Sequence, residues 1–299
     1  PNICAHTGTL NLSAYPTIGT GLAGYRVYES STGIAGPWAY IGGTAPGTLT
    51  FTTNTLTTGH TYYYKIEAFD NSGQVTSSSN RITFSCPSPI PPTFLYLVSV
   101  SVSTSNRVDV TAYVDTAASV LGYRVLRADE GSPNSFSAVG IIPAGTATMV
   151  MYSDYTADTD NKSYIYKVVN IDSCGFDGRS SNTARTIHLT ADGNTNDFTN
   201  TLHFNKYNYF DGKVMNYQVY RGLNAYLNYV RYTLDSLMTP DTTLVDTVWN
   251  VLGGDGNFYY QVMATENIGD TYGFQAISLS NIAIAKQQLQ IYVPNAFTP

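Results

Sequence analysis

One short block of sequence recurs three times and decides the fold. Its copies are Gly24-Tyr25-Arg26-Val27-Tyr28, Gly122-Tyr123-Arg124-Val125-Leu126 and Asn216-Tyr217-Gln218-Val219-Tyr220. The tyrosines of successive copies are 98 and then 94 residues apart. A unit of about one hundred residues buries enough apolar surface to fold as a domain. The chain of 299 residues is therefore predicted to hold three copies of one module.

Two further blocks follow in the same order within each copy. They are Tyr62–Ala68, Tyr164–Val169 and Phe258–Ala264, and then Ser78-Ser79-Asn80, Ser180-Ser181-Asn182 and Leu279-Ser280-Asn281. In Tyr62–Ala68 the side chains alternate between the two faces of a predicted strand. The inward face would hold Tyr62, Tyr64, Ile66 and Ala68, and the outward face Tyr63, Lys65 and Glu67. We expect an all-β chain of three tandem Ig-like β-sandwiches over residues 1–86, 87–190 and 191–291.

Composition excludes several classes of protein. The chain has 15 basic and 21 acidic residues, a net charge of −6, and only 12% charged residues. Binding to nucleic acid is excluded because it requires clustered Lys and Arg. Disorder is excluded because 43% of the residues are hydrophobic. What remains is a sparsely charged, polar β protein with 25 tyrosines.

Candidate catalytic and metal sites are few. Gly19–Gly24 fits the pattern G-x-G-x-x-G, but a strand follows it where a dinucleotide site needs a helix, so a loop is expected. Asp192–Asp197 resembles the start of a calcium loop, but Asp197 stands where glycine is needed and His203 where glutamate is needed. We interpret it as a linker between the second and third modules. The sequence predicts no enzyme, no metal site and no cofactor.

The corner before the second block carries a resemblance to a known family. Leu56-Thr57-Thr58-Gly59-His60-Thr61-Tyr62 resembles the E–F corner of fibronectin type III domains, in which the tyrosine hydroxyl bonds back to the corner backbone. The second module keeps this tyrosine as Tyr164, whereas the third has Phe258. The resemblance implies a fibronectin type III-like sandwich for each module, with residues 1–86 either holding a whole N-terminal strand or lacking part of one.

The resemblance also bears on the three cysteines. In a type III sandwich the F–G loop and the entry of the chain share one pole, which would bring Cys86 and Cys174 into disulfide range. Two buried free thiols are the alternative. If Cys86 and Cys174 are bonded to each other, Cys4 has no cysteine left to pair with in this sequence, and we expect its partner upstream of Pro1.

The last residues resemble a second family. Val293-Pro294-Asn295-Ala296-Phe297-Thr298-Pro299 resembles the opening of the gliding-motility-associated C-terminal domain, the type B sorting domain of the type IX secretion system of Bacteroidetes. Residues 292–299 would then begin a sorting domain. The resemblance implies two kinds of partner, the type IX translocon and outer-membrane anchoring proteins, and an extracellular location at the cell surface, associated with the outer membrane.

Tyrosines form the remaining candidate surface. Tyr226, Tyr229 and Tyr232 follow the third copy of the opening block. Further tyrosines are expected at outward positions, namely Tyr28, Tyr63 and Tyr259. Exposed aromatic rings bind sugars or protein partners. The alternative is cross-strand pairing that stabilises the sheet by about 0.2–1 kcal/mol a pair.

These observations predict the stalk or adhesion region of a large secreted surface protein, exported by the type IX system, with a gliding-motility adhesin as one form of it. Two alternatives stay open. One is an accessory β-sandwich region of a secreted hydrolase whose catalytic domain lies upstream of Pro1. The other is a carbohydrate-binding array that uses the tyrosine surface to hold surface glycans.

Overall fold

The computed structural model describes residues 2, 4–223, 230–234, 242–251 and 256–287. Over these residues the chain contains β-strands and loops and no helix. It divides into two compact units. The first holds Pro1–Ile90 together with Ser173–Gly175, and the second holds Pro91–Asp172 and Phe176–Pro299.

The first unit contains one sandwich of two sheets. Its sheets have the strand orders β1-β4 and β3-β2-β5-β6, and β7 pairs with the remaining part of β5. The strands are β1 Gly8–Asn11, β2 Leu22–Ser30, β3 Ala39–Thr44, β4 Thr50–Thr53, β5 His60–Asp70, β6 Thr76–Ser78 and β7 Ile82–Cys86.

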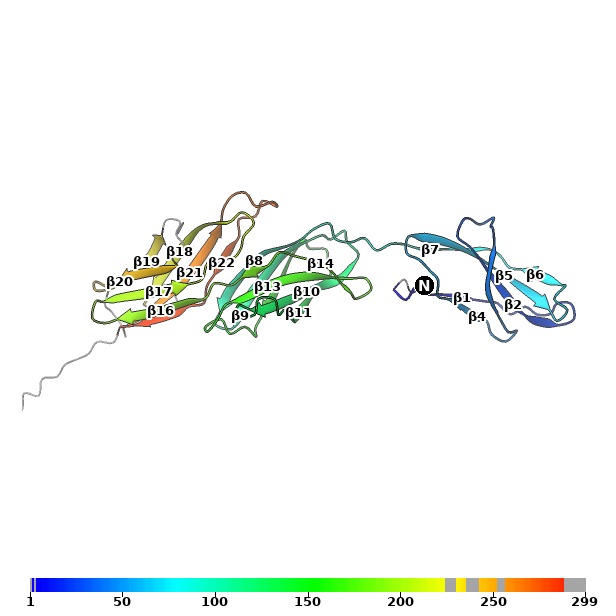
Figure 1. The fold of residues 1–299 in the computed structure, drawn as a ribbon, viewed down its shortest axis with the longest axis horizontal. Helices are drawn as coiled ribbons and strands as arrows, with labels where there is room; N and C mark the ends of the chain where they lie inside the picture. Colours follow the sequence, from blue (N-terminus) through cyan, green and yellow to red (C-terminus); the bar gives the residue numbers. More distant parts are fainter. Residues whose placement is uncertain (1, 3, 224–229, 235–241, 252–255, 288–299) are drawn as a thin grey trace, which may run out of the picture. The chain divides into compact units, whose positions relative to one another are not determined.

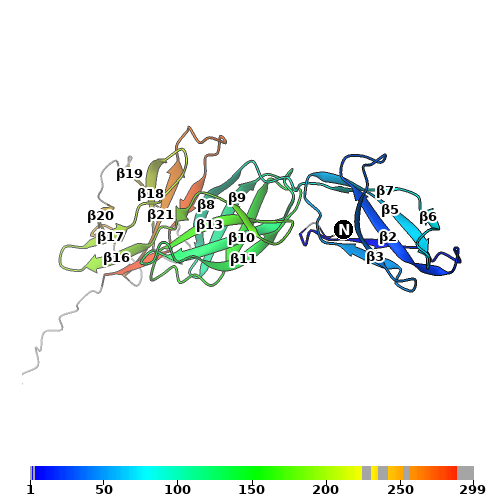
Figure 2. The ribbon, with the colours of Figure 1, turned by 45° about the vertical axis from the view of Figure 1, so that its right-hand side comes forward.

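The second unit contains two more sandwiches, whose strands can be followed in Figure 1 and Figure 2. The sheets of the first are β12-β9-β8 and β11-β10-β13-β14, with β15 also on β13. Its strands are β8 Leu95–Thr104, β9 Arg107–Val114, β10 Val120–Asp129, β11 Ser137–Pro143, β12 Met149–Asp154, β13 Tyr164–Asp172, β14 Asp177–Ser180 and β15 Ala184–Arg185.

The sheets of the third sandwich repeat this order as β16-β17-β20 and β19-β18-β21-β22, with β23 also on β21. Its strands are β16 Leu189–Asn194, β17 Thr199–Phe204, β18 Val214–Gly222, β19 Val230–Leu234, β20 Thr243–Thr247, β21 Asn257–Glu266, β22 Ile277–Leu279 and β23 Ala283–Lys286. In the second and third sandwiches a three-stranded sheet packs on a five-stranded one, which is a fibronectin type III-like arrangement. The predicted all-β class is confirmed.

The tyrosine of the opening block anchors each core. Tyr25, Tyr123 and Tyr217 are buried, and the hydroxyls of Tyr25 and Tyr217 accept hydrogen bonds from the backbone N–H of Tyr15 and Tyr207 at 2.8 and 2.9 Å. A buried tyrosine needs such a partner for its hydroxyl. The repeat found in the sequence is therefore a repeat of core positions, not of a surface.

The predicted alternation of β5 is confirmed at most positions. Tyr62, Tyr64 and Ala68 are buried, and Tyr63 lies on the other face. Ile66 is only half-buried, although it belongs to the inward set.

The tyrosine corner is present in two sandwiches. The Tyr62 hydroxyl accepts a hydrogen bond from Thr57 N at 2.9 Å, and the Tyr164 hydroxyl accepts one from Asp158 N at 2.9 Å. Phe258 occupies this position in the third sandwich and is fully buried. As the sequence predicts, its corner lacks the hydroxyl for such a bond.

The predicted linker at Asp192–Asp197 is wrong. These residues form the end of β16 and the turn that joins it to β17, and Asn194 Nδ2 donates to Asp197 Oδ2 across that turn at 2.9 Å. The third sandwich therefore begins with β16 at Leu189. Short Asn- and Asp-rich segments favour tight hairpins and linkers equally, so composition alone did not separate the two.

Asp70 closes the loop that leads into β2. It is buried at the end of β5, and its carboxylate accepts hydrogen bonds from Ser72 Oγ, Thr20 N and Val75 N at 2.7, 3.2 and 3.2 Å. These bonds, with that from Ser72 the strongest, hold the pKa of Asp70 well below its usual value. The Gly19–Gly24 loop is thus a folded connection to a strand, as predicted.

Acid is expected to loosen the first unit through Asp70. Because its folded pKa lies below the unfolded value of about 3.9, its stabilisation is present at neutral pH and is lost as the pH falls below about 4. The difference in urea midpoint between wild type and Asp70→Asn should therefore shrink from pH 7 to pH 3. Trp38 fluorescence in a Trp249→Phe background reports on this unit alone. A difference that stays constant with pH would contradict the assignment.

Candidate functional site

The disulfide differs from the predicted one. Cys4 is bonded to Cys174, whereas Cys86 is a buried free thiol. The physical reason is that Cys86 ends β7, opposite His60 of β5, and points into the core of the first sandwich with 1% of its surface exposed. Cys4 and Cys174 both lie in turns. The predicted Cys86–Cys174 pair is therefore wrong, as is the expectation that Cys4 finds its partner outside this chain.

Mass spectrometry distinguishes the two pairings. A thiol reagent added to the folded, unreduced chain should label no cysteine, because Cys86 is buried and the other two are oxidised. Unfolding without reductant should expose one labelled site, Cys86, and reduction should add two more. Labelling of Cys4 before reduction would contradict the pairing. Disulfides of this kind are typical of oxidising compartments.

The second and third sandwiches are joined along strand β8. Ser278 Oγ of β22 donates to Val100 O at 2.7 Å, and Ser101 Oγ accepts from Leu279 N at 3.0 Å. The Tyr207 hydroxyl accepts a third bond from Val100 N at 3.0 Å. Each of these groups is buried or half-buried, so each bond satisfies a polar atom that would otherwise lose its contact with water.

A cluster of five aromatic rings extends this junction. Phe94, Tyr96 and Tyr113 belong to the second sandwich, and Tyr272 and Phe274 to the loop between β21 and β22 of the third. Ring centroids are 5.7 Å apart for Phe94–Tyr272, 5.1 Å for Tyr96–Tyr272 and 5.3 Å for Tyr113–Phe274. Such pairs contribute about 0.5–1.5 kcal/mol each beyond burial of their area. We call these five rings the aromatic junction.

Tyr96 connects the aromatic junction to polar groups of the third sandwich. Its hydroxyl donates to Asp270 Oδ2 at 2.8 Å and accepts from Asp211 N at 3.3 Å. Asp270 also accepts from the backbone N–H of Tyr272 at 2.7 Å, which fixes the loop that presents that ring. Burial, together with the bond to Asp270, raises the pKa of Tyr96 well above its ordinary value. The hydroxyl therefore stays protonated and remains a donor over the whole physiological pH range.

The tyrosines predicted as a ligand surface are placed in part. Tyr232 lies on β19, while Tyr226 and Tyr229 lie outside the described residues. Tyr28 is half-buried at 5.8 Å from the Tyr40 ring, with Lys65 Nζ 4.8 Å above its own ring. Its contacts are those of cross-strand pairing. Val293, Pro294, Asn295, Ala296, Phe297, Thr298 and Pro299 also lie outside the described residues.

Two other features bear on function, namely possible metal sites and possible membrane-spanning helices. In the described ranges, no group of three or more His, Cys, Asp and Glu side chains could hold a metal ion. No helix of the described chain is long and apolar enough to cross a membrane.

The aromatic junction was missed from the sequence. Phe94-Leu95-Tyr96-Leu97 is apolar enough to indicate a strand, but such a pattern does not say what covers the outer face of that strand. A signal was nevertheless present. Tyr96 and Leu97 are both buried, so this strand is covered on two faces, and the uninterrupted apolar run reflects that.

No family model matches the chain, and no curated protein matches it. Among solved structures, the chain is similar to the chicken CNTN1 FN1-FN3 domains, with 13% identity and a TM-score of 0.24 over 91% of this chain and 97% of that one. The assignment of a fibronectin type III-like fold therefore rests on the strand order of the three sandwiches.

Proposed function

We propose that this chain is a structural spacer within a secreted cell-surface protein and has no catalytic role of its own. The observation that carries the proposal is the buried junction of the second and third sandwiches, made of hydrogen bonds between side-chain hydroxyls and backbone groups and of the aromatic junction. Domains joined by a short linker alone move independently by default, whereas a large apolar interface holds them as one body. Two sandwiches held as one body keep the segments at their two ends a constant distance apart, which is the role of a spacer.

A second part of the proposal concerns how the protein is exported and where it is located. We infer export by the type IX secretion system of Bacteroidetes and a place at the outer cell surface, with a gliding-motility adhesin as the parent protein. The support is the resemblance of Val293–Pro299 to a type B sorting domain and the presence of a disulfide, which is typical of exported proteins. The partners would be the translocon and outer-membrane anchoring proteins.

Residual dipolar couplings test the spacer directly. Amides of the second and third sandwiches in the full chain should fit a single alignment tensor, because the junction holds the two as one body. In Tyr96→Ala the two sets should need separate tensors, while Tyr28→Ala, a change outside the junction, should leave a single tensor. Two tensors in the unsubstituted chain would overturn the proposal.

Export is tested in the native host. Antibody to this region should label intact wild-type cells and should not label cells that lack the type IX translocon, where the protein should accumulate inside. Equal surface labelling in both strains would remove this part of the proposal and leave the spacer role untouched.

Binding of surface glycans through Tyr226, Tyr229 and Tyr232 stays a prediction. Glycan-array binding that is lost in Tyr226→Ala/Tyr229→Ala and kept in Tyr28→Ala would support it, and an array without signal would remove it.

A further inference from the structure

The third repeated block has the same local role in all three sandwiches. Ser79, Ser181 and Ser280 each accept a hydrogen bond from the strand beside them, from the N–H of Ile66, Val168 and Val262, at 2.9 Å in every case. Each serine also donates to the carbonyl of the asparagine that follows it, at 2.6–2.7 Å. The asparagine is thereby fixed in the same place in each sandwich.

In the second and third sandwiches this asparagine holds the first strand. Asn182 accepts from Leu97 N at 2.7 Å and donates to Leu97 O at 3.0 Å. Asn281 accepts from Leu189 N at 2.7 Å and donates to Leu189 O at 2.9 Å. Leu97 lies on β8 and Leu189 on β16, the strands that open the two sandwiches. One side-chain amide thus binds both backbone groups of an aliphatic strand residue, as an additional strand would.

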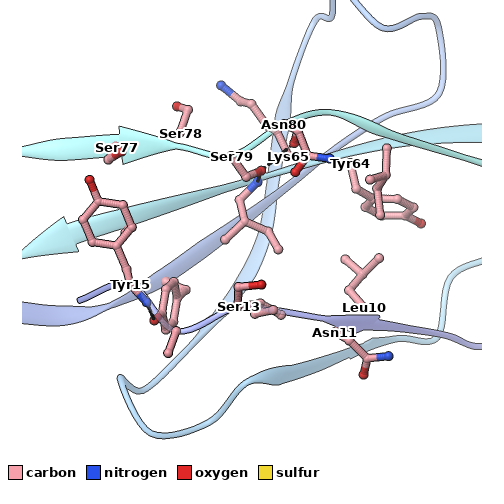
Figure 3. A pocket seen from close by; sticks show the side chains of 16 residues that line it. Leu10, Asn11, Ser13, Tyr15, Tyr64, Lys65, Ser77, Ser78, Ser79 and Asn80 are labelled. Carbon is pink, nitrogen blue, oxygen red and sulfur yellow. Dashed lines mark hydrogen bonds between the residues drawn. The ribbon is translucent and has the colours of Figure 1, made fainter. Parts of the chain in front are cut away.

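In the first sandwich the corresponding asparagine faces a groove. Asn80 is exposed and lines a cavity of about 260 Å³, bounded on one side by Leu10–Tyr15 and on the other by Ser77–Asn80 (Figure 3). A second cavity of about 140 Å³ continues along β1 and shares Leu10 and Ile82 with the first. In the other two sandwiches the equivalent asparagines bind β8 and β16 instead of facing a groove.

The side chains beneath the groove are apolar and less covered than their counterparts. Ile82 is 42% exposed, whereas Ala184 and Ala283, at the start of the matching strands, are 1% and 8% exposed. Ile66 is half-buried, whereas Val168 and Val262 at the same position are completely buried. The groove therefore has an apolar floor of the kind that an aliphatic strand covers.

The open edge of β1 points into this groove. Leu12 N bonds to Leu49 O and His6 O accepts from Leu56 N, so the even-numbered residues turn their backbone groups toward β4. Thr7 instead exchanges two hydrogen bonds with Asn2, at 2.8 and 3.1 Å. Because backbone groups alternate in direction along a strand, Thr9 and Asn11 share the direction of Thr7. Asn2 therefore lies on the open edge and runs antiparallel to β1.

We propose that this groove takes an antiparallel β-strand that enters from the amino-terminal side of Asn2, carries aliphatic residues at alternate positions, and is held by Asn80. The strand adds to β1 through Thr9 and Asn11, covers Ile66 and Ile82, and gives its backbone N–H and C=O to the Asn80 amide. Strand addition to an open edge is a general mode of recognition, with backbone bonds giving affinity and alternate pockets giving selectivity. The proposal is independent of the proposed function.

A strand extension tests it. Placing the nine residues of Leu95–Ser103 directly before Pro1 continues the Asn2–Thr7 register, so that the two valines nearest Pro1 lie opposite Leu10 and Leu12. The same valines lie opposite Val108 and Val110 in the second sandwich. Amide exchange of Thr9 and Asn11, measured by NMR, should slow by roughly 100-fold or more. A nine-residue Gly-Ser extension is the matched control and should change nothing.

The role of Asn80 has its own control. In the extended chain, Asn80→Ala should remove most of the added protection, whereas Asn182→Ala, the same change in another sandwich, should leave Thr9 and Asn11 unaffected. Without the extension, Asn80→Ala should leave the first unit folded, because the side chain is exposed. Unchanged exchange in the extended chain would overturn the proposal. So would protection in the original chain that grows with protein concentration, which would identify a second copy as the occupant.

Discussion

Replacing Asp246 with alanine is expected to destabilise the second unit by about 3–5 kcal/mol, the range for leaving a buried charge without its partner. Arg221 Nη1 bonds both carboxylate oxygens of Asp246, at 3.0 and 2.9 Å, and each side chain is 4% exposed. The Tyr260 hydroxyl donates to the same carboxylate at 2.6 Å. Asp246→Ala would leave the guanidinium buried without this carboxylate and the tyrosine without its acceptor. Urea unfolding followed by circular dichroism measures the loss.

A matched change in the second sandwich separates burial from charge. Asp154 bonds Arg127 and Tyr166 in the same way, at 2.8 and 2.9 Å, but Arg127 is 19% exposed. Asp154→Ala should therefore cost less than Asp246→Ala, because water can reach the freed arginine. The double variant Arg221→Met/Asp246→Leu should recover most of the lost stability, since an apolar pair of similar volume needs no partner. Equal losses in both sandwiches would contradict the role given to burial.

Tyr207→Ala is expected to cost about 3–5 kcal/mol, the range for deleting a buried aromatic side chain. The ring is buried 4.1 Å from that of Phe210, and its hydroxyl bonds Val100 N of the neighbouring sandwich. The cavity would open where the third sandwich meets the second. Differential scanning calorimetry of the full chain should show the transition of the second unit split in two, because the coupling between its sandwiches is weakened.

Tyr207→Phe isolates the hydroxyl in this result. It keeps the ring and leaves Val100 N without its acceptor, at an expected cost of about 1–3 kcal/mol. The second unit should still unfold in one transition, since the ring at position 207 still fills its buried site beside Phe210. If Tyr207→Ala also unfolds in a single transition, the contact of Tyr207 with β8 is not what couples the two sandwiches.

Much of the architecture could be predicted because it repeats. The alternation in β5 and the recurring block at Tyr25, Tyr123 and Tyr217 indicated which side chains form the cores. The tyrosine corner could also be predicted, because it depends on contacts between residues five or six apart in sequence. Features that local spacing determines were thus visible in the sequence.

The disulfide and the aromatic junction could not be predicted, because each joins residues that lie far apart in the sequence. Cys4 and Cys174 are separated by 170 residues, and Tyr96 and Asp270 by 174. Nothing in local alternation distinguishes a strand face that meets solvent from one that meets another domain. The resemblance misled on the cysteines, because the shared pole of the F–G loop and the chain entry in a type III sandwich suggested a pair between Cys86 and Cys174. A bond that occurs only once has no repeat to reveal it.

The disulfide has one consequence for the fate of the chain under proteolysis. Joining Cys4 to Cys174 closes the intervening backbone into a covalent ring that contains the whole of the first sandwich. A protease that cuts once inside this ring opens it without separating the pieces, because both ends stay attached through sulfur. Two cuts, or one cut and a reductant, are needed before any fragment is shed. The amino-terminal part of the chain is thus retained after a single cleavage.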